Sequence, residues 1–309
     1  MAGDKAMEYK PKPELNGNNN TSSKHMPKKP SYLRVRFTQG PNYRFVKSTL
    51  RELGLHTICE EAGCPNIYEC FESKTATFLI LGDICTRNCR FCQVHPGKPL
   101  PINKKEPLHI AKAVSRLGLK YAVITSVTRD DLPDGGASIF AHTIAEIRKV
   151  NPNCGIEVLI PDFAGDWQSL KVVIDAKPDI LNHNIETVPR LYPQIRPKAD
   201  YKRSLNLLGH AKIMGLTGKT KSGIMVGLGE EKDEVIEVMA DLRHYGCDIL
   251  TIGQYLAPTT SHFPIARYYN PSEFDEFKEI GQKIGFSYVE SGALVRSSYH
   301  AKEQFRQAS

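Results

Sequence analysis

The chain has 309 residues, 40% of them apolar and 24% charged, a composition that is ordinary for a globular protein with a full core. Its longest apolar runs, such as "YAVITSV" at 121–127, are too short to span a bilayer, and the first 30 residues lack the apolar stretch of a secretory signal. We therefore expect no membrane association and a cytoplasmic, reducing setting, where clustered cysteines bind metal or react more often than they form disulfides.

The net charge of +7 is concentrated at the N-terminus, where residues 1–40 carry eight Lys or Arg against three Asp or Glu. The rest of the chain is close to neutral, whereas a nucleic-acid-binding protein usually has a basic folded face. We therefore expect no nucleic-acid partner. Residues 1–30 are rich in Lys, Pro, Asn and Ser and have no apolar periodicity, which predicts a disordered leader.

Residues 31–75 are predicted to form an irregular N-terminal extension, and they contain the first of two cysteine triplets. The stretch "CEEAGCPNIYEC" places Cys59, Cys64 and Cys70 (the first triplet) in a CX4CX5C spacing. Spacing alone leaves a structural zinc site, surface thiols and an iron–sulfur cluster open as alternatives.

From residue 76 onward, six runs rich in β-branched residues alternate with helical patterns. Strands are expected at 76–82, 121–127, 155–160, 179–184, 222–228 and 248–254, and helices at 107–118, 137–150, 166–176, 201–215, 231–245 and 271–284. Runs that are apolar throughout suggest burial on both faces, and repeated strand–helix units imply a parallel sheet. We find no further units to complete an eight-fold barrel. The predicted fold is α/β, a partial (β/α)6 TIM-type barrel over 76–284 with a C-terminal extension at 285–309.

The second triplet is Cys85, Cys89 and Cys92 in "CTRNCRFC", directly after the first predicted strand. In barrels of parallel strands the chemistry lies at the C-terminal strand ends, so this loop is where a site is expected. The CX3CX2C spacing favours an iron–sulfur cluster. Spacing alone leaves two alternatives open, a zinc site completed by His95 and disulfides.

A CX3CX2C loop in this position, with Phe91 just before the last cysteine, resembles the radical S-adenosylmethionine superfamily. The resemblance implies a 4Fe–4S cluster with one open iron that binds S-adenosylmethionine, which then supplies a 5′-deoxyadenosyl radical. It also implies cofactor contacts near the strand ends by Phe91, Gly135, Gly136, Glu157, Asn182 and Gly227. The alternatives are core packing for the aromatic ring, plain turns for the glycines and internal hydrogen bonds for Glu157 and Asn182.

Five further stretches narrow the resemblance: "ICEEAGCPN", "SVTRDDLPDGGA", "NHNIETV", "KSGIMVGLGE" and "VRSSYHA". Together with the two triplets they closely resemble the lipoyl synthase family over residues 31–303. This resemblance implies a sulfurtransferase of lipoate biosynthesis and protein lipoylation. Its members insert two sulfur atoms at carbons 6 and 8 of an octanoyl chain held on a lysine of a lipoyl carrier protein. It also implies that the first triplet holds an auxiliary 4Fe–4S cluster, the sulfur source, which is consumed.

The implied partners follow from the same family. The carrier is expected to be a glycine-cleavage H protein or a 2-oxoacid dehydrogenase acyltransferase domain. An electron donor such as flavodoxin or ferredoxin and a protein that rebuilds the auxiliary cluster are also expected. Two rival interpretations are another radical S-adenosylmethionine enzyme that thiolates carbon and a zinc-stapled binding module without catalysis.

The family also provides a fourth ligand for the first triplet, a serine oxygen in an Arg-Ser-Ser-Tyr stretch. Here that stretch is 296–299, and motif alignment assigns Ser298, with Ser297 as the fallback. Serine oxygen matches a soft cluster less well than thiolate, which suits a cluster that is taken apart and gives Ser298 a catalytic role. Arg296 either positions the segment or forms a surface salt bridge. Packing roles are expected for Cys154, Cys247 and Trp167, whereas His183 is placed to face the site.

Overall fold

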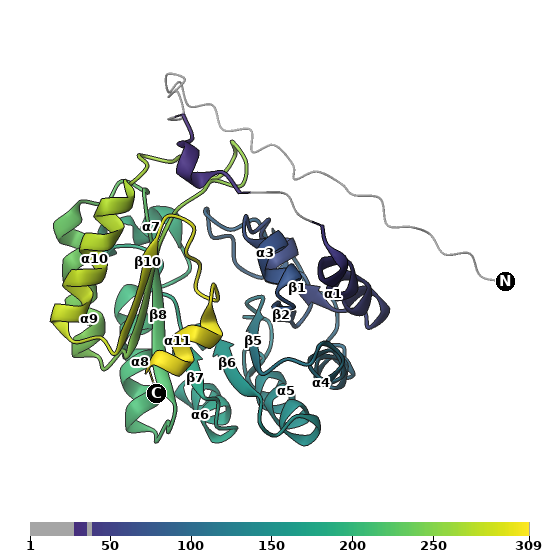
Figure 1. The fold of residues 1–309 in the computed structure, drawn as a ribbon. Coiled ribbons are helices and arrows are strands. Elements are labelled where there is room, and N and C mark those ends of the chain that lie inside the picture. The colour runs from purple at the N-terminus through teal and green to yellow at the C-terminus, as the bar shows by residue number, and fades with distance from the viewer. Residues whose placement is uncertain (1–27, 36–38, 309) are drawn as a thin grey trace.

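A curved eight-stranded sheet with helices along its outer side organises the chain in this computed structural model, which describes residues 28–35 and 39–308 (Figure 1). The strand order is β1–β2–β5–β6–β7–β8–β9–β10. Neighbouring strands from β2 to β10 are all parallel, and the short β1 (His56–Thr57) is antiparallel to β2. The sheet is therefore open, with β1 and β10 at its two edges. Most of the predicted leader lies outside the described residues.

The six predicted strands and six predicted helices are confirmed with small changes at their ends. The strands are β2 (Thr77–Ile80), β5 (Tyr121–Ser126), β6 (Gly155–Leu159), β7 (Ile180–Asn182), β8 (Lys219–Val226) and β9 (Ile249–Gln254). The helices are α4 (Glu106–Leu117), α5 (Ala137–Val150), α6 (Trp167–Asp175), α8 (Tyr201–Ile213), α9 (Lys232–His244) and α10 (Pro271–Ile284). Short elements between them are β3 (Ile84–Cys85), β4 (His95–Pro96), η2 (Phe163–Gly165), η3 (Pro189–Leu191) and α7 (Tyr192–Ile195).

Helix α10 shows how local sequence sets these ends. Asn270 and Glu273 form a reciprocal capping box at its start, and Pro271 occupies the first turn, where its missing N–H is not needed. Gly285 stops the helix in a left-handed conformation, with φ of +99°.

Two parts of the prediction differ from the structure. Residues 31–75 are not irregular, because they contain η1 (Ser31–Leu33), α1 (Pro41–Glu52), α2 (Ile58–Glu61) and α3 (Ile67–Glu72). The sheet also continues past residue 284 into β10 (Tyr288–Gly292). In β10 only Val289 is buried, so the apolar run that marks the other strands is missing, and pairing with β9 makes the segment a strand.

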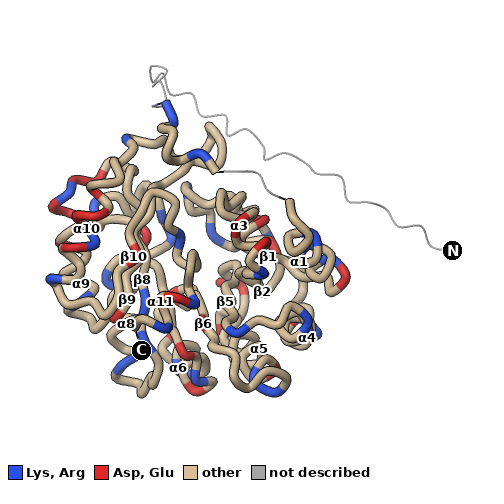
Figure 2. Tube along the Cα trace, in the orientation of Figure 1, with Lys and Arg blue, Asp and Glu red and all other residues tan. Residues whose placement is uncertain are grey.

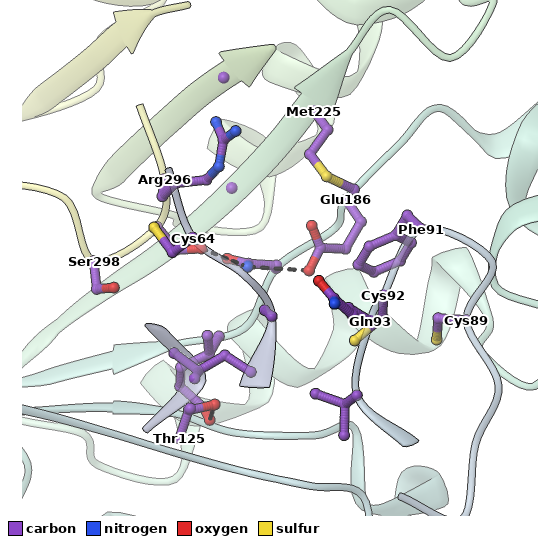
Figure 3. Close-up of a pocket in the computed structure, with 18 of the residues that line it drawn as sticks. Cys64, Cys89, Phe91, Cys92, Gln93, Thr125, Glu186, Met225, Arg296 and Ser298 are labelled. Atoms are coloured by element: carbon purple, nitrogen blue, oxygen red, sulfur yellow. Dashed lines mark hydrogen bonds between the residues drawn. The ribbon is translucent and has the colours of Figure 1, made fainter. Parts of the chain in front are cut away.

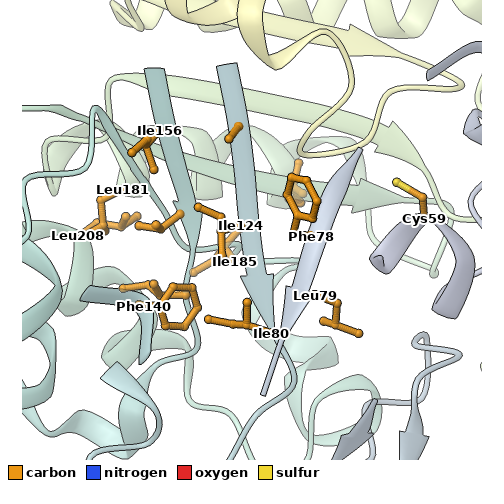
Figure 4. Close-up of a cluster of buried hydrophobic side chains, with 14 of the residues drawn as sticks. Cys59, Phe78, Leu79, Ile80, Ile124, Phe140, Ile156, Leu181, Ile185 and Leu208 are labelled. Carbon is orange, nitrogen blue, oxygen red and sulfur yellow. The ribbon is translucent and has the colours of Figure 1, made fainter. Parts of the chain in front are cut away.

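The core lies between the sheet and the outer helices. Figure 4 shows side chains of β2, β5, β6 and β7 packed against Phe140 of α5 and Leu208 of α8. The four residues of β2 are all buried, which is typical of a strand covered on both faces. Lys and Arg are interleaved with Asp and Glu on the surrounding helices (Figure 2). Throughout residues 28–35 and 39–308, every helix falls short of the length and apolarity needed to cross a membrane.

The C-terminal segment closes the open side of the sheet. Helix α11 (Ala301–Ala308) packs against the first residues of four strands, where Ala301 and Phe305 meet Tyr121, Ile180, Ile249 and Tyr288. Upstream of α11, the segment is hydrogen-bonded to the N-terminal extension, since Asn66 Nδ2 donates to Leu294 O (2.7 Å) and Tyr299 OH donates to Glu69 Oε1 (3.1 Å). The N-terminal extension and the segment between β10 and α11 thus meet beside β2.

Candidate functional site

A cavity of about 540 Å³ opens among the C-terminal ends of the parallel strands. Residues of both cysteine triplets line it: Cys59, Cys64, Cys85, Cys89 and Cys92 (Figure 3). A small hollow adjoins this cavity and is lined by Cys59, Cys64, Cys70 and Ser298, among others. The two triplets, separate in sequence and attached to different elements, therefore face one shared space.

The loop of the second triplet is tied down by backbone and charge. The backbone N–H groups of Arg87 and Thr128 both donate to Cys85 Sγ at 3.4 Å. The Arg87 guanidinium, 7% exposed, binds Asp130 (2.8 Å) after β5 and Asp162 (2.6 Å) after β6. Burial is the largest single effect on the Asp162 carboxyl and opposes its charge, but the hydrogen bond and charge of Arg87 and the charge of Arg203 act together with other neighbours to lower its pKa.

The first triplet is carried by α2, α3 and the turn between them. Thr57 caps α2 by accepting from the N–H of Glu60, and Cys59 lies on the buried side of this helix. Cys64 follows the helix, and Cys70 belongs to α3. Burial raises the pKa of the Cys59 thiol to about 12, and that of Cys92 in the other triplet to about 12 as well. Deprotonating these thiols therefore requires a strong positive partner such as bound metal.

The two serines of the Arg-Ser-Ser-Tyr stretch have different surroundings. Ser298 lines the hollow with all three cysteines of the first triplet, and its Oγ accepts a hydrogen bond from Thr77 Oγ1 at 2.8 Å. Ser297 is not among the residues that line the hollow; its Oγ accepts from Asn184 Nδ2 at 2.7 Å. The Arg296 guanidinium lies in the cavity near Cys64 rather than on the surface (Figure 3), and burial lowers its pKa.

Of the six residues expected to contact a cofactor, only Phe91 lines the cavity. Gly135 and Gly136 have positive φ and pack closely, so that a Cβ at Gly136 would overlap Leu81. Gly227 likewise leaves no room for a Cβ, because Gln254 and the carbonyl of Arg267 lie against it. These glycines therefore serve backbone turns and close packing in this structure.

Glu157 and Asn182 make internal hydrogen bonds below the cavity. The Lys221 ammonium binds both carboxylate oxygens of Glu157, at 2.9 and 3.1 Å. The side chains of Lys221, Glu157 and Asn182 are all fully buried. Tyr121 OH donates to the same carboxylate (3.0 Å), as does Asn182 Nδ2 (2.9 Å). Glu157 and Asn182 were expected either to contact the cofactor or to form internal hydrogen bonds. In the structure they form internal hydrogen bonds and do not line the cavity.

Three polar side chains that lie nearer the cavity than Glu157 and Asn182 were not predicted from the sequence. Asn184 lies two residues after Asn182, and Glu186 and Arg196 follow it; all three line the cavity together with His183. Burial raises the pKa of Glu186, while Arg196 opposes this shift. The signal was present in "NHNIETV", since polar residues just after a buried strand lie at the mouth of the sheet.

Several buried atoms in this wall have no hydrogen-bond partner within the described chain: His183 Nε2, Asn184 Oδ1 and Arg196 Nε. His183 Nδ1 lies 2.9 Å from Ile160 O and so carries the proton, which leaves Nε2 as an acceptor. Burial also lowers the pKa of His183 to about 4, so the ring is neutral near pH 7. Buried polar atoms without partners are costly, which makes this wall suited to a polar ligand.

The zinc alternatives find no support in the arrangement. A zinc ion holds its ligands at about 2.0–2.3 Å. Across residues 28–35 and 39–308, no three His, Cys, Asp or Glu side chains gather closely enough for a single ion. His95 is not among the residues that line the cavity. All eight cysteines are free thiols, so the disulfide alternative for the second triplet finds no support either.

Comparison with known proteins agrees with this geometry. The model of the radical SAM superfamily matches residues 79–242, and the model of the N-terminal domain of lipoyl synthase of the radical SAM family matches residues 1–64. Lipoyl synthase of Rubrobacter xylanophilus is 58% identical over 280 residues, covering 91% of this chain and 87% of its own. Lipoyl synthase of Caldicellulosiruptor saccharolyticus is 56% identical over 276 residues, covering 89% and 97%.

Solved structures with low sequence identity share the fold. Methylornithine synthase superimposes with a TM-score of 0.53 at 13% identity, covering 84% of this chain and 80% of that chain. Streptococcus suis SuiB bound to S-adenosylmethionine gives 0.55 at 11% identity, covering 74% of this chain and 55% of that one, little more than half its length. At these identities the likeness shows the mixed α/β fold with its mainly parallel sheet and nothing finer.

Proposed function

Because the chain belongs to the lipoyl synthase family of the radical S-adenosylmethionine superfamily, we propose that its two cysteine triplets hold 4Fe–4S clusters with different roles. The second triplet, Cys85, Cys89 and Cys92, would hold the cluster that binds S-adenosylmethionine. The first triplet would hold the auxiliary cluster. The observation that carries the proposal is that both triplets face one cavity, with Ser298 beside the first.

The reaction is the insertion of two sulfur atoms at carbons 6 and 8 of an octanoyl chain attached to a carrier lysine. When bound, the cluster on the second triplet would supply a 5′-deoxyadenosyl radical together with S-adenosylmethionine, and the auxiliary cluster on the first triplet would supply sulfide. The chain's own residues must then hold the octanoyl carbon between the two triplets and keep competing hydrogen donors away. The cavity is lined in part by Phe91, Leu159 and Met225, which provide apolar surface for this purpose.

Ser298 is the proposed fourth ligand of the auxiliary cluster. Its position with Cys59, Cys64 and Cys70, and the separate hydrogen bond of Ser297 to Asn184, support Ser298 over Ser297. An oxygen ligand is a weaker match than thiolate for a soft cluster, so its release would free an iron during sulfur transfer. Full two-sulfur turnover by the Ser298→Cys variant would contradict this role.

S-adenosylmethionine contacts are proposed for Phe91 and for the wall that carries unpartnered polar atoms. His183 Nε2 and Asn184 Oδ1 are acceptors placed for hydroxyl groups. Gly135, Gly136 and Gly227 are not on the cavity lining.

The substrate partners are octanoylated carrier proteins. Within that class we propose the glycine-cleavage H protein or a 2-oxoacid dehydrogenase acyltransferase domain. A flavodoxin or ferredoxin would donate electrons, and a separate protein would rebuild the auxiliary cluster. Eight free thiols favour a reducing compartment, so the cytoplasm is the proposed location.

Mass spectrometry of an octanoyl-lysyl peptide after anaerobic turnover tests the activity. Two added sulfurs are expected in the product, and a methylthio product would contradict the assignment. The reconstituted chain should contain about eight irons, four for each of two cubane clusters. Zinc in place of iron would contradict the cofactor assignment.

A further inference from the structure

Thr77 lies where the first triplet and the C-terminal segment meet. It is the first residue of β2, its side chain is 3% exposed, and it lines both the cavity and the hollow. Its hydroxyl donates to Ser298 Oγ at 2.8 Å across more than two hundred residues of sequence. Thr77 also hydrogen-bonds to the Cys59 thiol. One buried side chain therefore contacts two of the four proposed ligands.

The neighbouring serine is held from a different wall of the cavity. Asn184 Nδ2 donates to Ser297 Oγ at 2.7 Å and also to Glu186 Oε1 at 3.1 Å. Asn184 therefore holds Ser297, whereas Ser298 accepts its side-chain hydrogen bond from the Thr77 hydroxyl. The Ser298 oxygen is thus oriented by a residue that belongs to neither cysteine triplet.

We infer that Thr77 is a positioning residue for the auxiliary cluster: its hydroxyl holds the Ser298 oxygen toward the three cysteines of the first triplet. This inference rests on the proposed ligation by Ser298. A serine that ligates iron has given up its proton, and a hydrogen bond donated to the resulting oxygen anion is charge-assisted and stronger than a neutral one. In a buried site the donor cannot be replaced by water without rearrangement.

Threonine in a strand can also be explained by packing, since β-branched side chains suit strands. Valine has the same branched shape but no hydroxyl, so Thr77→Val removes the donor while it keeps most of the packing. Thr77→Ser removes a methyl group and keeps the donor. Thr143 is a matched control, because it is a fully buried threonine whose hydroxyl donates to Ile139 O within α5, and it lines neither the cavity nor the hollow.

The test measures how fast a chelator removes iron from the auxiliary cluster alone. In the full chain, alanine replaces the three cysteines of the second triplet, so that only the first triplet can be loaded. Iron release and the loss of the cluster absorption band are followed anaerobically. Thr77→Val should release iron about tenfold to a hundredfold faster than the parent, as expected for the loss of one hydrogen bond to a charged group. Thr77→Ser and Thr143→Val should release iron at close to the parent rate.

Equal release by Thr77→Val and the parent would overturn the inference, and so would equally fast release by Thr77→Val and Thr143→Val. Ser298→Ala separates this failure from failure of the proposed function. Fast release by Ser298→Ala with parent-like release by Thr77→Val would leave the ligation standing and remove the role of Thr77. Parent-like release by Ser298→Ala would overturn both. If Thr77→Val does not fold, as judged by circular dichroism, faster release by Thr77→Ser than by the parent still counts against a role of the hydroxyl.

Discussion

At the scale of single residues, His183 shows how burial fixes a charge state. Its pKa is lowered to about 4 by burial, with Arg196 acting in the same direction. The unfolded chain takes up this proton near pH 6.5, so between about pH 6.5 and 4 the unfolded state binds more protons than the folded one. The free energy of unfolding should therefore be intact above pH 6.5 and should fall as the pH drops toward 4, by about 3 kcal/mol from this group.

His183→Asn should flatten this pH dependence, because asparagine does not titrate and can still donate to Ile160 O. Urea unfolding of the metal-free chain between pH 7 and 4 measures it. His142, half-exposed on α5, is the control, and His142→Asn should keep the parental slope. Parallel curves for the two variants would show that His183 is not the group responsible.

The sequence predicts which strand and which face of the sheet carry the polar side chains near the site, but not how far along the strand each one lies from the cavity. Glu157 and Asn182 were expected at the cavity, and they lie one layer too deep, in contact with Lys221. In parallel strands, alternate residues share a face, so the pattern alone does not tell which of Asn182 and Asn184 reaches the rim. The depth depends on how the strands are staggered and where the sheet closes, which no local pattern contains. The position of the cysteine triplets does not depend on this stagger, because both triplets lie outside the eight-stranded sheet.

At the scale of elements, Arg87 joins the loop of the second triplet to the loops that follow β5 and β6. Arg87→Met should leave Asp162 without its main buried partner, a change that typically costs about 3–5 kcal/mol. We expect the second triplet to lose iron while the first retains it, which iron analysis and electron paramagnetic resonance of the reduced chain would show. Arg203, which binds the same carboxylate at 2.8 Å from the more exposed side, provides the control. Equal iron loss in Arg203→Met would refute a specific role for Arg87.

The buried pair of Lys221 and Glu157 ties β8 to β6 beneath the cavity. Lys221→Met should destabilise the chain by about 3–5 kcal/mol, because it leaves a fully buried carboxylate without a cation. The double variant Lys221→Met/Glu157→Gln should recover most of this loss, since a buried pair itself contributes little net stability. Denaturant unfolding at pH 7 measures both. A double variant no more stable than the single would contradict this account.

The elements themselves were predicted well wherever the apolar pattern was strong. All six buried strands and the helices that follow them were found within a few residues of their observed ends. β10 and α1 were missed for different reasons. β10 buries only Val289, so it lacks an apolar run. In α1 the buried residues Tyr43, Val46 and Leu50 are separated mostly by charged and polar residues, so its apolar pattern is weak.

At the scale of the whole molecule, α11 covers the N-terminal ends of the strands. Deleting residues 301–309 should expose Tyr121, Ile249 and their neighbours, at about 1.5–3 kcal/mol for each large side chain uncovered. We expect a lower melting temperature for the metal-free chain by circular dichroism. Phe305→Ala should give a smaller shift in the same direction. An unchanged melting temperature in the deletion would mean that α11 does not stabilise this end of the sheet.

The contact between the N-terminal extension and the segment that holds Ser298 has a consequence for biosynthesis. A ribosome releases the first triplet, the second triplet and every strand of the sheet before it releases Ser298. Domains can begin folding while the chain is still being made, at about 5–20 residues per second. The proposed second-triplet cluster has all of its protein ligands early, whereas the proposed auxiliary site is incomplete until Ser298 has been made. Insertion of the sulfur-donating cluster is then a step that must wait until the whole sheet has left the ribosome.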